Sequence, residues 1–323
     1  MVNLFVVLKT VAFGLMAVAW SVPFVLAVPF SQLRYVLLRH AARPLRGAVD
    51  ACQRALRVPY TLVVRSFAHL CLGCMGLVVR HADAESARNV RAARARGGPC
   101  VVAFQHVCFA DPIVAGALFP EARFVMKHEL NKVFFIFYPA VASGFIDVRR
   151  SSPESRAQCT ARMVATVARY DDTLALAPEG TRNRGDPLHL LPFKKGAFVV
   201  ATETGAPVVP VVHYYAERCW DRAYARLMPR PTAIAVKVLA PVVPRPGESV
   251  DDLQERVRAA MQAELDKGRP AESLVALSPR DRLRLALYPC AVYLAYALLA
   301  LGLFRLCHSS SSASSASTAA NLQ

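Results

Sequence analysis

The sequence has few acidic residues and no ordered arrangement of cysteines. Its 323 residues include 23 aspartates and glutamates against 39 lysines and arginines, a formal net charge of +16 at pH 7. The nine cysteines are odd in number and show no repeated spacing, which argues against a secreted domain held together by disulfides. Cys71 and Cys74 form a CxxC pair, but no second Cys or His pair follows at metal-ligand spacing. We therefore expect no metal site, and two reduced cysteines on an apolar segment.

Several other signatures are missing as well. No internal repeat is visible, and no glycine-rich loop ends in the Lys-Ser/Thr pair of nucleotide triphosphatases. Basic residues are not interleaved with aromatic ones, which argues against a nucleic-acid partner. What the chain does have is 54% hydrophobic residues together with its basic charge. This combination favours phosphate-bearing ligands and anionic lipid surfaces.

Two apolar runs predict membrane segments. Residues 4–30 could cross a bilayer core of about 30 Å, and Pro23 and Pro29 would also allow a hairpin. A cleaved signal peptide is the alternative for this run. Residues 285–304 have the length of one spanning helix, with a buried core helix as the alternative. Arginines flank the region between the two runs from both ends, so the positive-inside rule places residues 31–284 on the cytoplasmic side.

Three further segments have simpler patterns. Residues 60–79 are apolar but contain Arg65 and His69, which favours a helix lying on the membrane surface. Residues 83–97 predict a short, charged surface helix. The serine-rich tail at residues 309–323 is of low complexity and is expected to be disordered.

The central region alternates short apolar runs with helical patterns. Helix starts are indicated by Asp111 before Pro112 and by Ser152 before Pro153, and Gly205 indicates a helix end. We expect strands at residues 101–105, 122–126, 144–148, 173–177, 207–212 and 232–239, and helices at residues 111–119, 127–138, 153–169, 193–204 and 249–266. The alternation predicts an α/β fold with a largely parallel sheet flanked by helices.

The stretch QHVCFAD contains the first candidate for chemistry. His106 lies on the turn between a predicted strand and the helix that begins near Asp111. Across such a turn the carboxylate can accept the imidazole proton and leave the other ring nitrogen free as a base. The alternative is that Asp111 only caps the helix and His106 is an ordinary loop residue. Cys108, between them, is a weaker candidate for a nucleophile.

The stretch PEGTRNRGDPLHLLPFKKGAF contains candidate anion ligands. Gly180 would let a ligand approach the backbone closely, and Arg182 offers a planar fork for phosphate oxygens. Lys194 and its neighbour add charge at a predicted helix start. Glu179 could hold Arg182 or bind a substrate hydroxyl. An ordinary charged surface loop is the alternative for the whole stretch.

Two more stretches complete the pattern. GFIDVRR ends a predicted strand with Arg149 and Arg150, a further possible anion contact, and GAPVVPVV is an apolar strand. The four stretches resemble, in sequence and order, the four blocks of the glycerolipid acyltransferase family, above all the 1-acyl-sn-glycerol-3-phosphate acyltransferases. The resemblance covers roughly residues 100–212. Gln105 stands where that family most often has asparagine.

The resemblance implies acyl-coenzyme A-dependent transfer of a fatty acyl group to the sn-2 hydroxyl of lysophosphatidic acid, with no cofactor beyond this co-substrate. It implies that His106 is the general base, that Asp111 orients it, and that the phosphate-bearing substrate is bound by Arg150, Glu179, Gly180, Thr181, Arg182 and Lys194. Glycerol-3-phosphate or another lysophospholipid could be the acceptor instead. The scaffold could also serve a catalytically idle lipid-binding protein.

The expected organisation follows from these patterns. It comprises an N-terminal membrane segment with interfacial helices (residues 1–80), an acyltransferase catalytic domain (81–270), a C-terminal transmembrane helix (271–308) and the disordered tail (309–323). We expect an integral membrane protein of the endoplasmic reticulum, with its catalytic domain facing the cytoplasm.

Overall fold

The computed structural model describes residues 25–38, 46–221, 226–227 and 231–287, together with a few single positions near both ends. The predicted tail at residues 309–323 lies outside the described residues. Most of the predicted C-terminal span, and the predicted N-terminal segment before residue 25 apart from single positions, also lie outside them.

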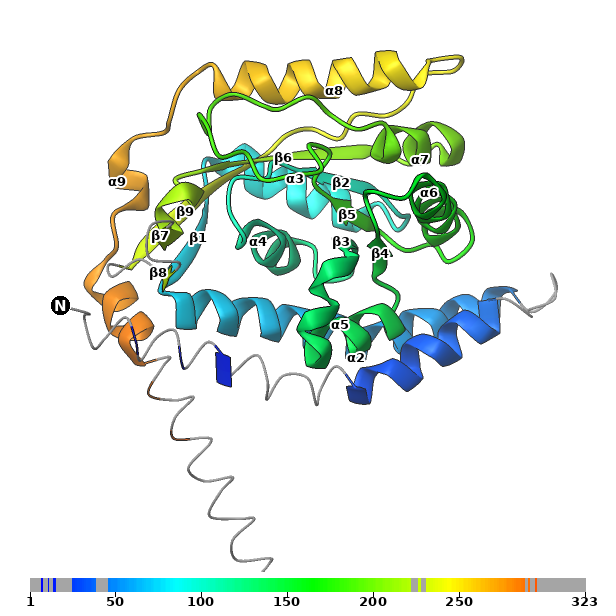
Figure 1. Ribbon diagram of the computed structural model, residues 1–323, viewed down its shortest axis with the longest axis horizontal. Coiled ribbons are helices and arrows are strands. Elements are labelled where there is room, and N and C mark those ends of the chain that lie inside the picture. Colours follow the sequence, from blue (N-terminus) through cyan, green and yellow to red (C-terminus); the bar gives the residue numbers. More distant parts are fainter. Residues whose placement is uncertain are drawn as a thin grey trace, which may run out of the picture.

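Seven strands form one sheet in the order β1-β9-β6-β2-β5-β3-β4 (Figure 1). The strands are β1 (Leu77–His81), β2 (Val101–Phe104), β3 (Arg123–Lys127), β4 (Ile146–Val148), β5 (Leu174–Leu176), β6 (Val208–Tyr214) and β9 (Thr232–Val238). Every pairing is parallel except β6 with β9. All six predicted strands and the largely parallel sheet are therefore confirmed. Strand β1 and the short hairpin of β7 (Trp220–Asp221) and β8 (Arg226–Leu227) were not predicted.

Helices cover both faces of the sheet. The helices are α2 (Arg46–Met75), α3 (Ala84–Ala95), α4 (Asp111–Leu118), α5 (Phe134–Ala142), α6 (Pro153–Ala168), α7 (Gly196–Thr204), α8 (Val250–Leu265) and α9 (Glu272–Val275), with the 3-10 helices η2 (His128–Lys132) and η3 (Ala216–Cys219). One core packs α2, α3 and α4 against the sheet, and a second core packs α6, α7 and α8 against its other face. Burial on both faces explains why strands such as VVAF are apolar throughout.

Helix boundaries agree with several sequence signals. Ser152 caps α6 by accepting the amide of Ser155, and Gly205 ends α7 in the left-handed conformation at φ 68°. The single helix predicted at residues 127–138 is wrong, because Val133 has a non-helical backbone that separates η2 from α5. The helix predicted at 60–79 is also wrong in its extent: it begins at Arg46 and ends before Gly76, whose φ of 75° redirects the chain into β1.

Helix α2 is partly a core helix. Its residues Ala55–Met75 are long and apolar enough to cross a membrane by length and composition, yet 44% of this stretch's most apolar window is buried in the protein. Tyr60, Val64, Ala68 and Cys71 form a buried stripe at helical spacing. On the opposite side Leu62 is 58% exposed. Helix α2 is therefore amphipathic. Its predicted position on a membrane surface stays a prediction.

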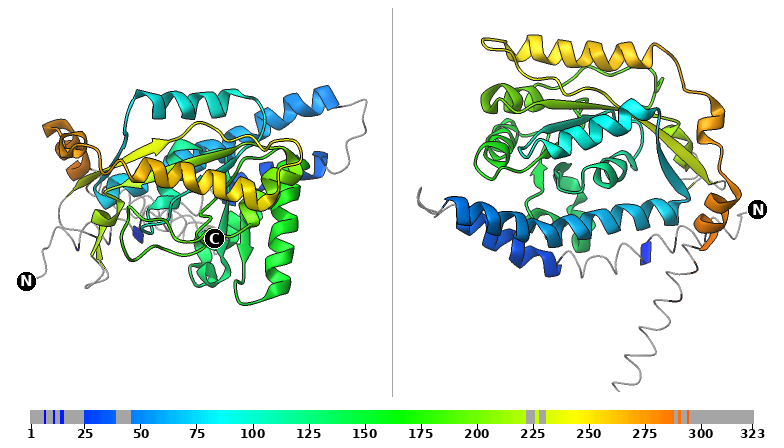
Figure 2. Two further views of the ribbon diagram at one scale, coloured as in Figure 1. Left: turned by 90° about the horizontal axis from the view of Figure 1, so that it is seen from above. Right: turned by 180° about the vertical axis from the view of Figure 1, so that it is seen from behind.

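A buried carboxylate ties the N-terminal helices to the sheet. The helix Val25–Leu38 lies beside α2 (Figures 1 and 2). Asp172, just before β5, binds Arg34 of that helix at 2.6 Å and Arg123 of β3 at 3.2 Å. Arg57 of α2 approaches the same carboxylate at 3.5 Å. The Arg123 guanidinium also lies over the Tyr60 ring, 3.5 Å from its centroid. These contacts join the helix Val25–Leu38, α2 and β3 to one buried carboxylate.

Asp172→Asn should therefore destabilise the fold by about 3–5 kcal/mol, because it leaves the buried guanidiniums of Arg34 and Arg123 without a counter-charge. The matched control is Asp171→Asn, since Asp171 is half exposed and asparagine tolerates its φ of 53°. That change should cost less than about 1 kcal/mol. Unfolding of the purified protein in denaturant measures both values, and equal losses would contradict the assignment.

Candidate active site

His106 lies two residues after the end of β2, and hydrogen bonds hold its backbone on both its amide and its carbonyl side. Its amide donates to the Glu179 carboxylate at 2.8 Å, and its carbonyl accepts the amide of Asn183 at 2.7 Å. The second Glu179 oxygen accepts the amide of Leu191 at 3.1 Å. Both partners belong to the loop that follows β5, the neighbour of β2 in the sheet. The loop therefore fixes the position from which the His106 side chain projects.

The His106 ring meets Asp111 across the turn. Nδ1 of His106 lies 3.0 Å from Oδ2 of Asp111, and the same oxygen accepts the amides of Val107 and Cys108 at 2.6 and 2.7 Å. An ionised carboxylate only accepts hydrogen bonds, so Nδ1 carries the proton and Nε2 is left as an acceptor. The His106 side chain is 20% exposed. The geometry thus provides an oriented base that solvent or a substrate can reach.

The interpretation of Asp111 as a helix cap is wrong. The N-cap of α4 is Ala110, and Asp111 is the first residue of the helix. Its carboxylate turns back to the preceding turn and accepts the amides there. Burial raises the pKa of Asp111, but the contacts of its carboxylate with His106 and His213 outweigh the effect of burial and lower the pKa to about 2. Asp111 is therefore a buried, fully ionised partner for the His106 ring.

Cys108 is placed to support Asp111. Its thiol donates to Asp111 Oδ1 at 3.3 Å and lies 3.2 Å from the sulfur of Cys219. The contact with Cys219, burial and the charge of Asp111 all raise the pKa of the Cys108 thiol well above its usual range. A protonated, buried thiol is a poor nucleophile, which speaks against the covalent alternative.

The predicted ligands on the loop after β5 are of two kinds, because Glu179 is buried whereas Thr181 and Arg182 are exposed. Glu179 is buried, burial raises its pKa, and its two oxygens are used by backbone amides. It braces the loop and does not hold Arg182. Gly180 adopts φ 67°, and a Cβ there would lie 3.3 Å from Lys194 Cγ. Thr181 and Arg182 are exposed at the tip.

Two pairs of adjacent cations, Arg149 with Arg150 and Lys194 with Lys195, have members that differ in their contacts. Arg149 lies 3.0 Å from Nε2 of His128, which in turn contacts Asp147. Lys195 pairs with Asp251 of α8 at 2.7 Å. Arg150 and Lys194, by contrast, make no side-chain hydrogen bond or ion pair to any residue that the structure describes. These two side chains are therefore the members of each pair without a carboxylate partner among the described residues, and their role in binding an anion stays a prediction.

Three polar residues near the pair were missed. Asn183 holds the His106 carbonyl and bonds within its own loop, and Gln105 links the amide of His213 to the carbonyl of Pro187. His213, on β6, places Nδ1 3.4 Å from Asp111 Oδ1. A polar residue inside or directly after an apolar strand was the available signal for Gln105 and His213.

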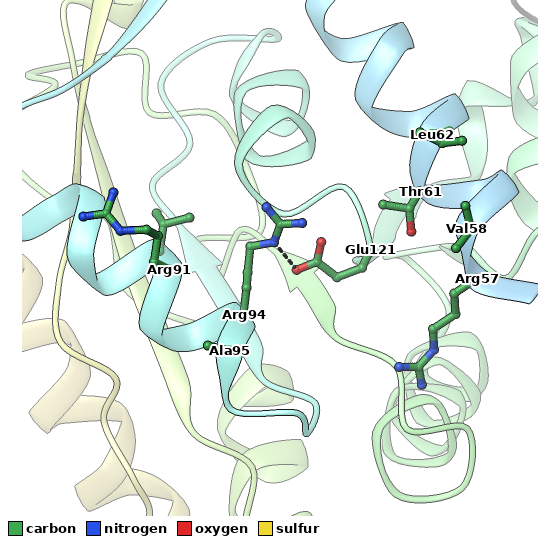
Figure 3. A pocket seen from close by; sticks show the side chains of 9 residues that line it. Arg57, Val58, Thr61, Leu62, Arg91, Arg94, Ala95 and Glu121 are labelled. Atoms are coloured by element: carbon green, nitrogen blue, oxygen red, sulfur yellow. Dashed lines mark hydrogen bonds and ion pairs between the residues drawn. The ribbon is translucent and has the colours of Figure 1, made fainter. Parts of the chain in front are cut away.

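A cavity of about 560 Å³ lies between α2 and α3 (Figure 3). Its lining comprises Arg57, Val58, Thr61, Leu62, Val90, Arg91, Arg94, Ala95 and Glu121. Glu121 precedes β3 and pairs with Arg94 at 3.1 Å, while Arg57 is engaged by Asp171 and Asp172. The cavity therefore opens at the amino ends of the parallel strands, whereas His106 lies at their carboxyl ends.

Known proteins share this domain. Residues 81–214 match the family model described as acyltransferase. The chain is 33% identical over 113 residues to a chloroplastic 1-acyl-sn-glycerol-3-phosphate acyltransferase of Brassica napus, covering 35% of this chain and 32% of that protein. It is 29% identical over 152 residues to the 1-acyl-sn-glycerol-3-phosphate acyltransferase of Saccharomyces cerevisiae, covering 47% and 48% of the two chains. The chain thus spans about a third of the Brassica napus protein and about half of the Saccharomyces cerevisiae protein.

The fold has a solved counterpart. The crystal structure of PlsC from Thermotoga maritima, a 1-acyl-sn-glycerophosphate acyltransferase, superimposes with a TM-score of 0.60 at 19% identity. The match covers 84% of this chain and all of that one. At this identity the likeness establishes the α/β architecture.

Asp111 should make the folded state sensitive to acid. Its pKa is about 2 in the fold, below the ordinary value of 3.8, so its contribution to the free energy of unfolding is complete above about pH 4. The contribution, about 2 kcal/mol, is lost as the pH falls towards 2. Asp111→Asn should remove it, so that the stability difference from the unsubstituted protein shrinks with acidification. Denaturant titrations from about pH 6 downward measure this difference.

The control for that experiment is Asp251→Asn, at an exposed carboxylate on α8. A stability difference between the Asp111 variant and the unsubstituted protein that stays constant with pH would contradict the assignment.

Proposed function

We propose that the chain, whose residues 81–214 match the acyltransferase family model, transfers a fatty acyl group from acyl-coenzyme A to the sn-2 hydroxyl of lysophosphatidic acid. The observation that carries the proposal is the His106–Asp111 pair, held at 3.0 Å with Nε2 of His106 unobstructed by the carboxylate. The acceptor is suggested by the curated relatives, which are named 1-acyl-sn-glycerol-3-phosphate acyltransferases.

The proposed reaction is a direct transfer. Nε2 of His106 takes the proton of the acceptor hydroxyl as its oxygen attacks the thioester carbonyl. The C–S bond then breaks, and the proton passes from His106 to the departing coenzyme A thiolate. Such general-base catalysis contributes about 10²–10⁴-fold, or about 3–5 kcal/mol of the barrier. Neither a covalent acyl-enzyme nor a metal or cofactor is required for this route.

Asp111 has two roles in this scheme. It fixes the tautomer of His106 that leaves Nε2 free, and its charge stabilises the imidazolium formed during the attack. Because the amides of Val107 and Cys108 already donate to Asp111, we propose that amides at the start of α4 stabilise the oxyanion.

The phosphate group of the acceptor would be bound by cations at the same end of the sheet. Arg150, Arg182 and Lys194 are exposed, and Gly180 lets a ligand come close to the backbone beside Thr181. Arginine forks suit a phosphate monoester, although a diester or glycerol-3-phosphate could use the same groups. Glu179 contributes indirectly, by bracing this loop against His106.

A membrane position fits the lipid substrates. Exposed large apolar side chains occur on the helix Val25–Leu38 and on α2, for example Leu26 at 64% and Leu62 at 58%. These two helices run along one side of the protein (Figure 1). We propose that this side rests on the bilayer, with anionic lipid attracted by the basic surface. Placement at the cytoplasmic face of the endoplasmic reticulum belongs to the same proposal.

A catalytically idle lipid-binding protein is the second candidate. The pair disfavours it, because a scaffold that only binds lipid has no need to hold a buried, ionised Asp111 against a partly exposed imidazole.

Purified protein in detergent, given labelled acyl-coenzyme A and a panel of acceptors, should form phosphatidic acid from lysophosphatidic acid. His106→Ala should abolish transfer, and Asp111→Asn should lower it at least about tenfold by losing the correct tautomer. Transfer that survives His106→Ala would overturn the mechanism. Cys108→Ala removes a weak donor to Asp111 but no reacting group, so it should lower the activity only a few-fold; complete loss of activity in a folded protein would favour the covalent route.

Arg150→Ala should raise the KM for lysophosphatidic acid about tenfold while changing kcat less, because one charge-assisted contact to the substrate is lost in ground and transition states alike. The matched control is Arg149→Ala, at the neighbouring residue that contacts His128. Steady-state kinetics for both variants measure the difference. A larger KM effect in the Arg149 variant would reverse the assignment.

A further inference from the structure

A second imidazole lies behind Asp111. His213 is on β6 and is 1% exposed. Neither of its ring nitrogens makes a hydrogen bond to any residue that the structure describes, and Nδ1 is 3.4 Å from Oδ1 of Asp111. Its backbone amide is fixed by Gln105 at 3.1 Å. Buried polar groups almost always have partners, so a buried imidazole that lies 3.4 Å from a carboxylate without a hydrogen bond to it needs an explanation.

The two oxygens of Asp111 are unequally satisfied. Oδ2 faces three N–H groups, from His106, Val107 and Cys108. Oδ1 faces the Cys108 thiol at 3.3 Å and His213 at 3.4 Å. A thiol is a weak donor, whereas an imidazole N–H is a full one. His213 is therefore the strongest donor side chain near the less satisfied oxygen.

We propose that His213 is a positioning residue for acyl transfer: its Nδ1–H donates to Asp111 Oδ1 and holds the carboxylate so that Oδ2 stays aligned with His106. A small rotation of the imidazole ring would complete this bond, as catalytic hydrogen bonds are often poorly aligned until substrate binds. The inference rests on the proposed function, since it assigns His213 a role in that reaction.

A second donor also changes how strongly Asp111 acts on His106. Hydrogen bonds to a carboxylate spread its charge, so Asp111 attracts the imidazolium form of His106 less strongly when His213 also donates. The other ionisable groups around the pair are Glu179 at the His106 amide, Cys108 beside Asp111, and Cys219 on η3. Substitution of His213 leaves all three in place.

Two substitutions separate donation from packing. His213→Leu fills a similar volume without a donor, whereas His213→Asn keeps an N–H near the position of Nδ1. We expect kcat of the leucine variant to fall about tenfold while KM stays nearly unchanged, as for other residues that hold a catalytic side chain in its orientation. The acid limb of its pH profile should move to higher pH by about half a unit. The asparagine variant should regain most of the rate and the original acid limb.

Tyr214→Phe is the control for general damage to β6. Tyr214 is the next residue, belongs to the core on the other face of the sheet, and donates to the Glu264 carbonyl at 3.1 Å. This variant loses a hydrogen bond from the same strand without touching Asp111, so its pH profile should match that of the unsubstituted protein.

A measurement without substrate distinguishes failure of this inference from failure of the proposed function. Diethyl pyrocarbonate modifies neutral imidazoles, and mass spectrometry of the His106 peptide follows the modification of this partly exposed side chain against pH. The pH midpoint should be higher in His213→Leu than in the unsubstituted protein or in His213→Asn. If the midpoint shifts but no acceptor is acylated, the proposed function fails and the positioning role stands. Identical midpoints for all three proteins, or identical behaviour of the leucine and asparagine variants, would overturn the role of His213.

Discussion

The buried carboxylate of Asp111 is the constraint on which the arrangement at the end of β2 depends. A carboxylate that is fully buried and ionised needs hydrogen-bond donors, because an unpaired buried charge costs several kcal/mol. The turn supplies them by bending until the amides of Val107 and Cys108 reach Oδ2. That bend is what brings the ring of His106 to the same oxygen. The arrangement of His106 and Asp111 is thus a consequence of satisfying a buried charge.

A second buried carboxylate, that of Glu179, links the turn after β2 to the loop after the neighbouring strand β5. The two carboxylate oxygens of Glu179 accept hydrogen bonds from the amides of His106 and Leu191, and these bonds join the loop after β5 to the turn after β2. Asp172 plays a comparable part near the other end of β5, where it gathers Arg34 and Arg123. At the amino end of β5, Asp172 therefore attaches helices to the sheet. The partly exposed imidazole of His106 lies at the opposite, carboxyl end of the parallel strands. Sites in open α/β sheets generally form at the carboxyl ends of the strands.

The sequence predicted those features that leave a local pattern. Continuous apolar runs indicated the six central strands, and the polar residues after two of them indicated His106 and the loop beginning at Glu179. Strand β1 was missed because it follows the apolar end of α2 with only Gly76 between them. The partners of Glu179 could not be predicted, since they are backbone amides, one of them 73 residues away. Asp111 before proline had the pattern of a cap, and only the fold shows its carboxylate turned backward.

Adjacent cations show how the fold makes similar residues unequal. Successive side chains at a strand end point to opposite sides, so one arginine of the pair after β4 reaches His128 while Arg150 does not. At the start of α7 the helix directs Lys195 towards Asp251 and leaves Lys194 beside Gly180. The net charge of +16 is thus a poor guide to where an anion binds. What matters is which cations remain without a carboxylate near the carboxyl ends of the strands, and Arg150 and Lys194 meet that condition in the part of the chain that the structure describes.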